Sequence, residues 1–325
     1  MIGLYGDNIL YNIGLKDNSI IYIKMNAPKF DEYVNNKKDK LSKNTINTYT
    51  QLYKKMFKHF GKEPVDIDED ILIDSILKDM LTDKGEIITN PNTLTSLFNT
   101  VIIVKKEFDF PITKLLKAKE NLLENIYDHR EAQKIIKANK LPSYKDVKNH
   151  LKKQFDDEDH IGYIINFMMQ SFFTRNKDLD IHITTSLKLA KDPEKNYLVI
   201  RNWDLMYIKN VYKTAKTYGS MKFNFRDRKL TYAIQKFIES QPENPEQTEW
   251  ALIQNANGFP LDETSQAKFI RKHTLNGMSE SDIFKIRVDD FEKKGDLKGL
   301  MEASRRRGTN LATLIKNYSL TMKPP

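Results

Sequence analysis

The amino-acid sequence predicts a mainly α-helical protein with a small antiparallel β-sheet, organised as two domains. Three observations carry this prediction. Apolar residues recur at helical spacing over most of the chain, and the period changes to strand-like alternation only after Arg175. The length of 325 residues exceeds what one typical core organises. A hydrophobic content of 39% is sufficient for two buried cores.

The first predicted domain is a helical bundle over residues 28–125, preceded by an N-terminal arm over residues 1–27. The arm alternates short apolar runs with Gly, Asp and Asn, a pattern typical of an extended segment with one strand. Short connections between the bundle's helices favour compact packing. The helices are predicted from Ser42 to the residue before Gly61, around residues 69–80, over residues 92–108 and after Pro111.

A polar, charged segment over residues 126–142 is predicted to link the bundle to a second domain over residues 143–325. The second domain combines helices with short strands. Its helices are predicted at 143–155, 161–172, 230–238 and through the C-terminal third, with strands at 180–185, 197–201, 205–212 and 221–225.

The charge of the chain points to a polyanionic partner. A formal net charge of +9 and a pI of about 9.2 favour nucleic acid first and a membrane surface second, although an AT-rich coding sequence also enriches lysine. The chain contains no cysteine, which excludes disulfides and thiolate chemistry. We find neither a signal segment nor a long apolar run, so we expect an intracellular protein that acts wherever its target DNA lies.

Neither a metal nor a cofactor is predicted. The six histidines show no metal-ligand spacing. The one obvious acidic cluster, Asp156-Asp157-Glu158-Asp159, is typical of a loop ahead of a helix.

Four segments of the second half stand out by residue type and order. Together with Ser42-Lys43-Asn44-Thr45-Ile46-Asn47-Thr48-Tyr49 in the first domain, they resemble the tyrosine recombinase and integrase family over roughly residues 28–320. This resemblance implies a helical, SAM-like core-binding domain followed by an α+β catalytic domain. The four segments are Phe172-Phe173-Thr174-Arg175-Asn176-Lys177-Asp178-Leu179, then residues 211–219, then Ile283-Phe284-Lys285-Ile286-Arg287, and finally residues 307–318.

The resemblance implies that Arg175 is the first catalytic arginine and that Asp178 orients it. A guanidinium fork binds a phosphate oxygen bidentately and stays charged. The alternative is an arginine at a helix end that complements the helix dipole. For residues 211–219, which lie on a predicted β-hairpin, the resemblance implies a catalytic lysine, preferably Lys213 and otherwise Lys216, that protonates the departing 5′ oxygen. Either lysine could instead be a solvated turn residue or a plain phosphate contact.

The second catalytic arginine implied by the resemblance is Arg287, which lies 31 residues before Tyr318. The family's usual form is His-x-Leu-Arg, and here Phe284 takes the histidine position. The competing segment is Lys268-Phe269-Ile270-Arg271, in which a basic residue takes that position. We prefer Arg287 because Arg271 leaves 47 residues before the tyrosine, too many for the usual two or three helices.

Tyr318 is the nucleophile that the resemblance implies. Thr309 lies nine residues before it, where the family has His or Trp, and its hydroxyl can still donate a hydrogen bond. The alternative is that Tyr318, one of 15 tyrosines, simply packs with Leu314 and Ile315. A phenol is mostly protonated at neutral pH, so clustered cations must stabilise its attack on phosphorus.

The function implied by the resemblance is site-specific cutting and rejoining of double-stranded DNA through a 3′-phosphotyrosyl intermediate, without a cofactor, by a homotetramer on two DNA sites. The alternatives are a type IB topoisomerase and a catalytically impaired DNA-binding protein, because the usual histidines are replaced. The residues expected to contact the DNA backbone are Lys43, Arg305, Arg306 and Arg307.

Overall fold

The computed structural model describes residues 27–320 except residues 243, 245, 256 and 257, so the predicted N-terminal arm lies almost wholly outside the described residues. The chain divides into two compact units, residues 1–132 and residues 133–325. The division falls within residues 126–142. The predicted fold class, mainly helical with a small sheet, is confirmed.

The first unit is a bundle of helices around a core that includes Tyr53, Met56, Leu97 and Phe98. Its strongest helix begins where the Ser42 side chain accepts a hydrogen bond from the Thr45 N–H. The four predicted helices are confirmed as α2 (Lys43–Phe60), α3 (Glu69–Lys78), α4 (Pro91–Glu107) and α5 (Thr113–Ala138), the last of which continues past residue 132. Helix α1 (Pro28–Lys37) and the short 3-10 turn η1 (Pro64–Asp66) were not predicted.

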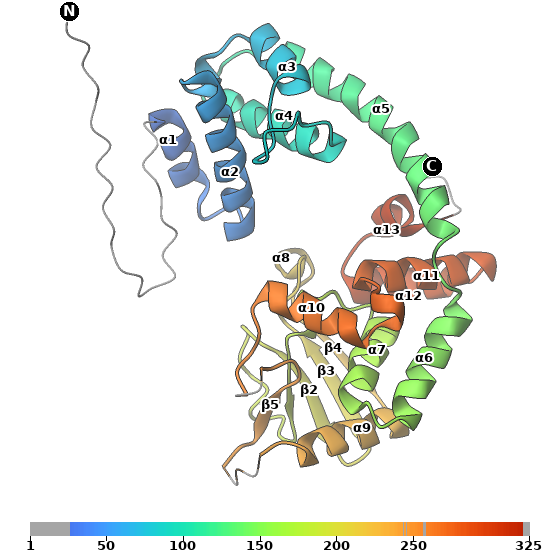
Figure 1. Cartoon of the computed structure of the whole chain (residues 1–325). Coiled ribbons are helices and arrows are strands. Elements are labelled where there is room, and N and C mark those ends of the chain that lie inside the picture. The colour runs from blue at the N-terminus through green and yellow to red at the C-terminus, as the bar shows by residue number, and fades with distance from the viewer. Residues whose placement is uncertain (1–26, 243, 245, 256–257, 321–325) are drawn as a thin grey trace, which may run out of the picture. The chain divides into compact units, whose positions relative to one another are not determined.

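The segment predicted as a linker is helical as far as Ala138, because α5 continues through it (Figure 1). The sequence of α5 contains neither glycine nor proline, so nothing in it breaks the helix. Its polar composition therefore indicates an exposed helix as readily as a loop.

The second unit contains a five-stranded sheet with the order β4-β3-β2-β1-β5. The β1–β2 pair is parallel and the other pairs are antiparallel, so the sheet is mixed and not wholly antiparallel as predicted, because β1 and β2 are joined by a crossover and not by a tight hairpin turn. The short strand β5 lies in a loop that the sequence did not mark as a strand. The strands are β1 (Ile181–Thr184), β2 (Asn196–Arg201), β3 (Asp204–Lys209), β4 (Met221–Phe225) and β5 (Glu249–Ala251).

Helices cover one face of this sheet, as Figure 1 shows for α7 and α9. Alternation along β2 sends Leu198 and Ile200 into the large core under the helices, while Tyr197 and Val199 join a smaller cluster on the other face. The helices around the sheet are α6 (Tyr144–Asp156), α7 (His160–Phe172), α9 (Arg228–Glu239) and α10 (Glu263–His273), with the 3-10 turns η2 (Lys177–Leu179) and η3 (Leu275–Gly277).

Three C-terminal helices build a separate apolar cluster with Phe173, the residue that follows α7. Phe284, Val288, Leu300 and other side chains form its centre, and Tyr318 packs against it. These helices are α11 (Glu280–Lys293), α12 (Leu297–Arg307) and α13 (Leu311–Tyr318), and the short helix α8 (Ala215–Tyr218) lies between β3 and β4. The cluster therefore holds the C-terminal tyrosine against the end of α7.

Within the described part of the chain, no helix combines the length and apolarity that crossing a membrane requires. Nor do the described residues contain a group of three or more metal-ligating side chains.

Candidate active site

Arg175 occupies the turn where the apolar helix α7 gives way to the sheet. Helix α7 ends at Phe172, and Phe173 takes a left-handed conformation with φ 53°, which redirects the chain. The Arg175 main-chain N–H donates to Asp178 Oδ2 at 3.0 Å, and its Nη1 donates to the Arg307 carbonyl at 2.8 Å. Burial, and then the positive charge of Arg307, lowers the pKa of Arg175. The Arg175 guanidinium is therefore bonded to the main chain at the end of α12, in the positive field of the Arg307 side chain.

A buried ion pair supports Arg175 from the sheet side. Lys209 and Asp178 are both 0% exposed, and Lys209 Nζ lies 2.7 Å from Asp178 Oδ2. The same ammonium donates to the Arg306 carbonyl at 3.1 Å. Burial lowers the pKa of Lys209, and the Asp178 carboxylate opposes that shift. The pair thus ties the end of β3 to the turn after α7 and to the last turn of α12.

Sequence reasoning missed Lys209. A signal was present, because Lys209 follows Leu205 and Tyr207 on the inward-facing side of an apolar strand, where a solvated lysine is not expected.

We expect Asp178→Asn to lower the free energy of unfolding of the second unit by about 3–5 kcal/mol, because it leaves a buried ammonium without its counter-charge. Trp203 and Trp250 are the two tryptophans of the chain and both lie in this unit, so their fluorescence in urea reports its unfolding. The exposed pair Asp204–Arg226 supplies the matched control, since Asp204→Asn should cost only about 0–1 kcal/mol. Equal losses of unfolding free energy in Asp178→Asn and Asp204→Asn would contradict the expectation that the buried pair contributes more to stability than the exposed pair.

The phenol of Tyr318 and the guanidinium of Arg307 meet at the centre of the site. Arg307 Nη2 lies 3.4 Å from Tyr318 Oη and 2.8 Å from Glu280 Oε2. Tyr318 is half-buried and packs its ring edge-on against Phe284, with centroids 4.7 Å apart. Glu280 was not marked by sequence reasoning, and a carboxylate in the first turn of a helix gives no sequence signal beyond a favourable helix dipole.

The turn that carries Lys213 is docked against Gly308. Thr214 Oγ1 donates to the Gly308 carbonyl at 2.5 Å, and Tyr212 Oη donates to the Gly219 carbonyl at 2.6 Å. Lys213 itself is exposed. The residue that follows Lys213 therefore contacts the residue that follows Arg307.

The neighbours of Gly308 leave no room for a side chain at this position. Its φ is +64°, and a Cβ there would lie 2.7 Å from the Tyr212 ring and 2.8 Å from Thr214 Oγ1. Gly295 has the same φ of +64° but nothing within 4 Å of such a Cβ, so it isolates the backbone effect. We expect Gly295→Ala to cost about 1–2 kcal/mol for the left-handed conformation alone. Gly308→Ala should lower the free energy of unfolding by about 1–3 kcal/mol more than Gly295→Ala, because the added methyl group overpacks the turn. Urea unfolding measures both losses, and equal losses would rule out the close packing of the turn.

Arg287 has contacts of its own in α11. Its Nη1 lies 2.7 Å from Asp290 Oδ2, and its guanidinium stacks over the rings of Tyr144 at 4.3 Å and Phe291 at 3.9 Å. None of its described contacts is with Arg175, Arg307 or Tyr318. Phe284, one turn earlier, is buried and contacts both the Arg307 guanidinium and the Tyr318 ring.

The structure also places the remaining predicted residues. Thr309 is half-buried, and its main chain bonds to Ser304. In the arginine run, Arg305 is exposed and paired with Glu302, whereas Arg306 is partly buried and donates to the Ser171 carbonyl. The four remaining predicted residues are all exposed. They are Lys216 on α8, Lys268 and Arg271 on α10, and Lys43 on α2 in the other unit.

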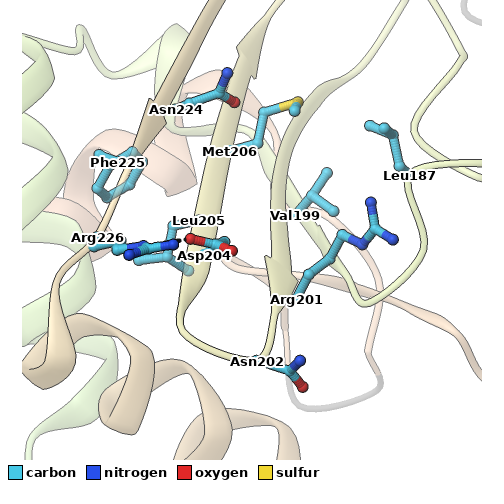
Figure 2. Close-up of a pocket in the computed structure, with 10 residues that line it drawn as sticks. All are labelled: Leu187, Val199, Arg201, Asn202, Asp204, Leu205, Met206, Asn224, Phe225 and Arg226. Carbon is cyan, nitrogen blue, oxygen red and sulfur yellow. Dashed lines mark hydrogen bonds and ion pairs between the residues drawn. The ribbon is translucent and has the colours of Figure 1, made fainter.

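A hollow of about 790 Å³ lies on the other face of the sheet, over β2, β3 and β4. Figure 2 shows Val199, Met206 and Asn224 side by side in it, with the Arg226–Asp204 ion pair at one end. None of the predicted catalytic residues lines this hollow. It is therefore separate from the site around Tyr318.

Comparison with known proteins finds similarity only among solved structures. No protein-family model matches the chain, and no curated protein matches it. Among solved structures, the chain is similar to one described as the crystal structure of XerA recombinase, with 12% sequence identity and a TM-score of 0.36 over 91% of this chain and 93% of that chain. A similarity at this level does not decide function, which depends on this chain's own residues.

Proposed function

We propose that this protein is a site-specific DNA recombinase that cuts and rejoins DNA strands through a 3′-phosphotyrosyl intermediate on Tyr318. The observation that supports it most is the 3.4 Å separation of Tyr318 Oη from a guanidinium group, with a second guanidinium, that of Arg175, bonded to the same segment. Preorganised cations around a nucleophile are what attack on a phosphodiester requires, because negative charge grows on the phosphate oxygens.

The proposed step is an in-line displacement. Tyr318 Oη forms a bond to phosphorus and its proton passes to water, which can reach a half-buried side chain. The bond from phosphorus to the 5′ oxygen breaks, and its electron pair stays on that oxygen. Lys213 supplies the proton that makes the leaving group a free 5′-hydroxyl. Arg175 binds a non-bridging oxygen throughout, and rejoining is the reverse reaction with another 5′-hydroxyl.

Double-stranded DNA is the proposed partner. The formal net charge of +9 favours it, and exposed lysines such as Lys43 and Lys216 are available for phosphate contacts in each unit. Exchange between two DNA sites cuts four strands, each of which requires one nucleophile. The proposal therefore includes a tetramer on two sites.

The test uses a library of nicked duplexes with a randomised central segment, in which a cut beside the nick releases a short strand and traps the covalent complex. We expect wild-type protein to form a complex that survives detergent, and mass spectrometry to locate the adduct on Tyr318. Sequencing the trapped DNA would give the preferred site.

Three other outcomes overturn all or part of the proposal. Binding without any covalent complex would leave a catalytically impaired DNA-binding protein that has kept the site's residues. An adduct on another residue would remove Tyr318 from the mechanism. Trapped sequences without preference, together with relaxation of a supercoiled plasmid, would favour a topoisomerase.

A further inference from the structure

The contacts of Arg307 set it apart from the other arginines of the chain. It is the last residue of α12, it is only 1% exposed, and its Nη1 donates to the Phe173 carbonyl at 3.0 Å. Its guanidinium lies over the Phe284 ring at 4.0 Å and over the Tyr318 ring at 4.9 Å. Its Nε is buried and has no hydrogen-bond partner among the described residues, a property that Arg287 Nε shares, so the contact with Tyr318 is what distinguishes Arg307. The Arg307 guanidinium is therefore held rigidly, and its Nε–H can still donate a hydrogen bond.

The attack geometry gives this guanidinium a role. For Tyr318 to attack, its oxygen must approach phosphorus to about 3–3.5 Å. That oxygen is itself 3.4 Å from Arg307 Nη2, so the phosphate's non-bridging oxygens come within reach of the same guanidinium. Arg287 has no corresponding contact, because its guanidinium stacks on Tyr144 and Phe291 and pairs with Asp290.

Local charge also fits an incoming phosphodiester. Lys209 and Asp178 neutralise each other, and Glu280 offsets one of the two guanidinium charges of Arg175 and Arg307. One positive charge then remains beside Tyr318, which matches the single negative charge of a phosphodiester. Glu280 is 16% exposed and holds the Arg307 fork at 2.8 Å, so it is suited to orienting the guanidinium toward the phenol.

We infer that Arg307, rather than Arg287, is the second catalytic arginine, which binds the scissile phosphate together with Arg175 and stabilises the attacking oxygen of Tyr318. Glu280 is its positioning residue. This inference rests on the proposed function and deepens it, because it assigns the phosphate-binding group of the same site. Arg307 was predicted to contact the DNA backbone together with Arg305 and Arg306. The inference gives Arg307 a catalytic role instead.

The test compares two diesters in one protein preparation. A preferred duplex is made with either the natural phosphate or a methylphosphonate at the cleavage position, where a methyl group replaces one charged oxygen. A cation that binds this oxygen is needed for the first substrate and not for the second. The ratio of the two initial rates of adduct formation does not depend on the folded fraction, so reduced stability of a variant does not obscure the result.

In Arg307→Gln we expect the rate on phosphate to fall by about 10²–10³-fold and the rate on methylphosphonate to fall by less than about tenfold, so that the ratio collapses. Arg287→Gln is the matched control, because Arg287 is also a stacked arginine paired with a carboxylate, and its ratio should stay at the wild-type value. A ratio unchanged in Arg307→Gln overturns the inference while leaving the proposed function intact. A ratio lowered in Arg287→Gln alone would return the role to Arg287. Failure of the wild-type protein to form any adduct overturns the proposed function, and the inference with it.

Discussion

Tyr318→Phe is expected to abolish the covalent protein–DNA complex, a loss of at least about three orders of magnitude in the rate of adduct formation. The substitution removes the oxygen that forms the bond to phosphorus, so no residual covalent pathway remains. The ring stays in place, because its packing against Phe284 and the Arg307 guanidinium does not use the hydroxyl. The hydrogen bond lost at 3.4 Å is worth only about 1 kcal/mol or less.

The measurement is denaturing electrophoresis of the trapped complex alongside DNA affinity at a fixed salt concentration. Affinity should stay within about twofold of wild type, because phosphate contacts by cations dominate it. Tyr232→Phe is the matched control, since Tyr232 is an exposed tyrosine on α9 and its loss of a hydroxyl should not alter the adduct. A normal yield of adduct from Tyr318→Phe would refute the assignment of the nucleophile.

Lys213→Ala is expected to slow cleavage of the natural phosphodiester by about 10²–10⁴-fold, the range typical of a general acid. An alkoxide leaves poorly without a proton, and Lys213 is exposed on the turn that is docked against Gly308. Replacing the bridging 5′ oxygen by sulfur should restore the rate, because a thiolate leaves without protonation.

Lys216→Ala distinguishes the two lysines of this turn. Lys216 is also exposed, on α8, and the same pair of substrates applies to it. Rescue by sulfur in Lys216→Ala and not in Lys213→Ala would transfer the role to Lys216. If neither variant is slowed, the turn contributes no general acid.

Much of the fold could be predicted because it follows from local periodicity. The helices near Ser42–Phe60 and Ile161–Phe172 carry apolar residues at helical spacing between good caps, so their existence does not depend on distant contacts. Strand β5 escaped prediction because its three residues are half-buried and pair with β1, a partner far away in the sequence. The helical course of α5 through the predicted linker was missed because polar composition does not separate exposed helices from loops.

The candidate site was predicted unevenly. The resemblance of the sequence segments to a known family brought Arg175, Asp178 and Tyr318 to attention, and in the structure Arg307 contacts both Arg175 and Tyr318. Lys209 and Glu280 were missed, because one lysine in a strand and one acidic residue in a first helical turn are common outside active sites.

The helical and strand segments, the basic charge and the presence of a tyrosine after a run of arginines can be read from the amino-acid order, since each depends on residue type and near neighbours. Which guanidinium reaches that tyrosine depends on how the helices pack. Arg287 and Arg307 both follow apolar helical patterns, but the left-handed turn at Gly308 folds α13 back onto α11 and α12, so Tyr318 meets Arg307. That choice depends on packing between helices, which no local pattern encodes.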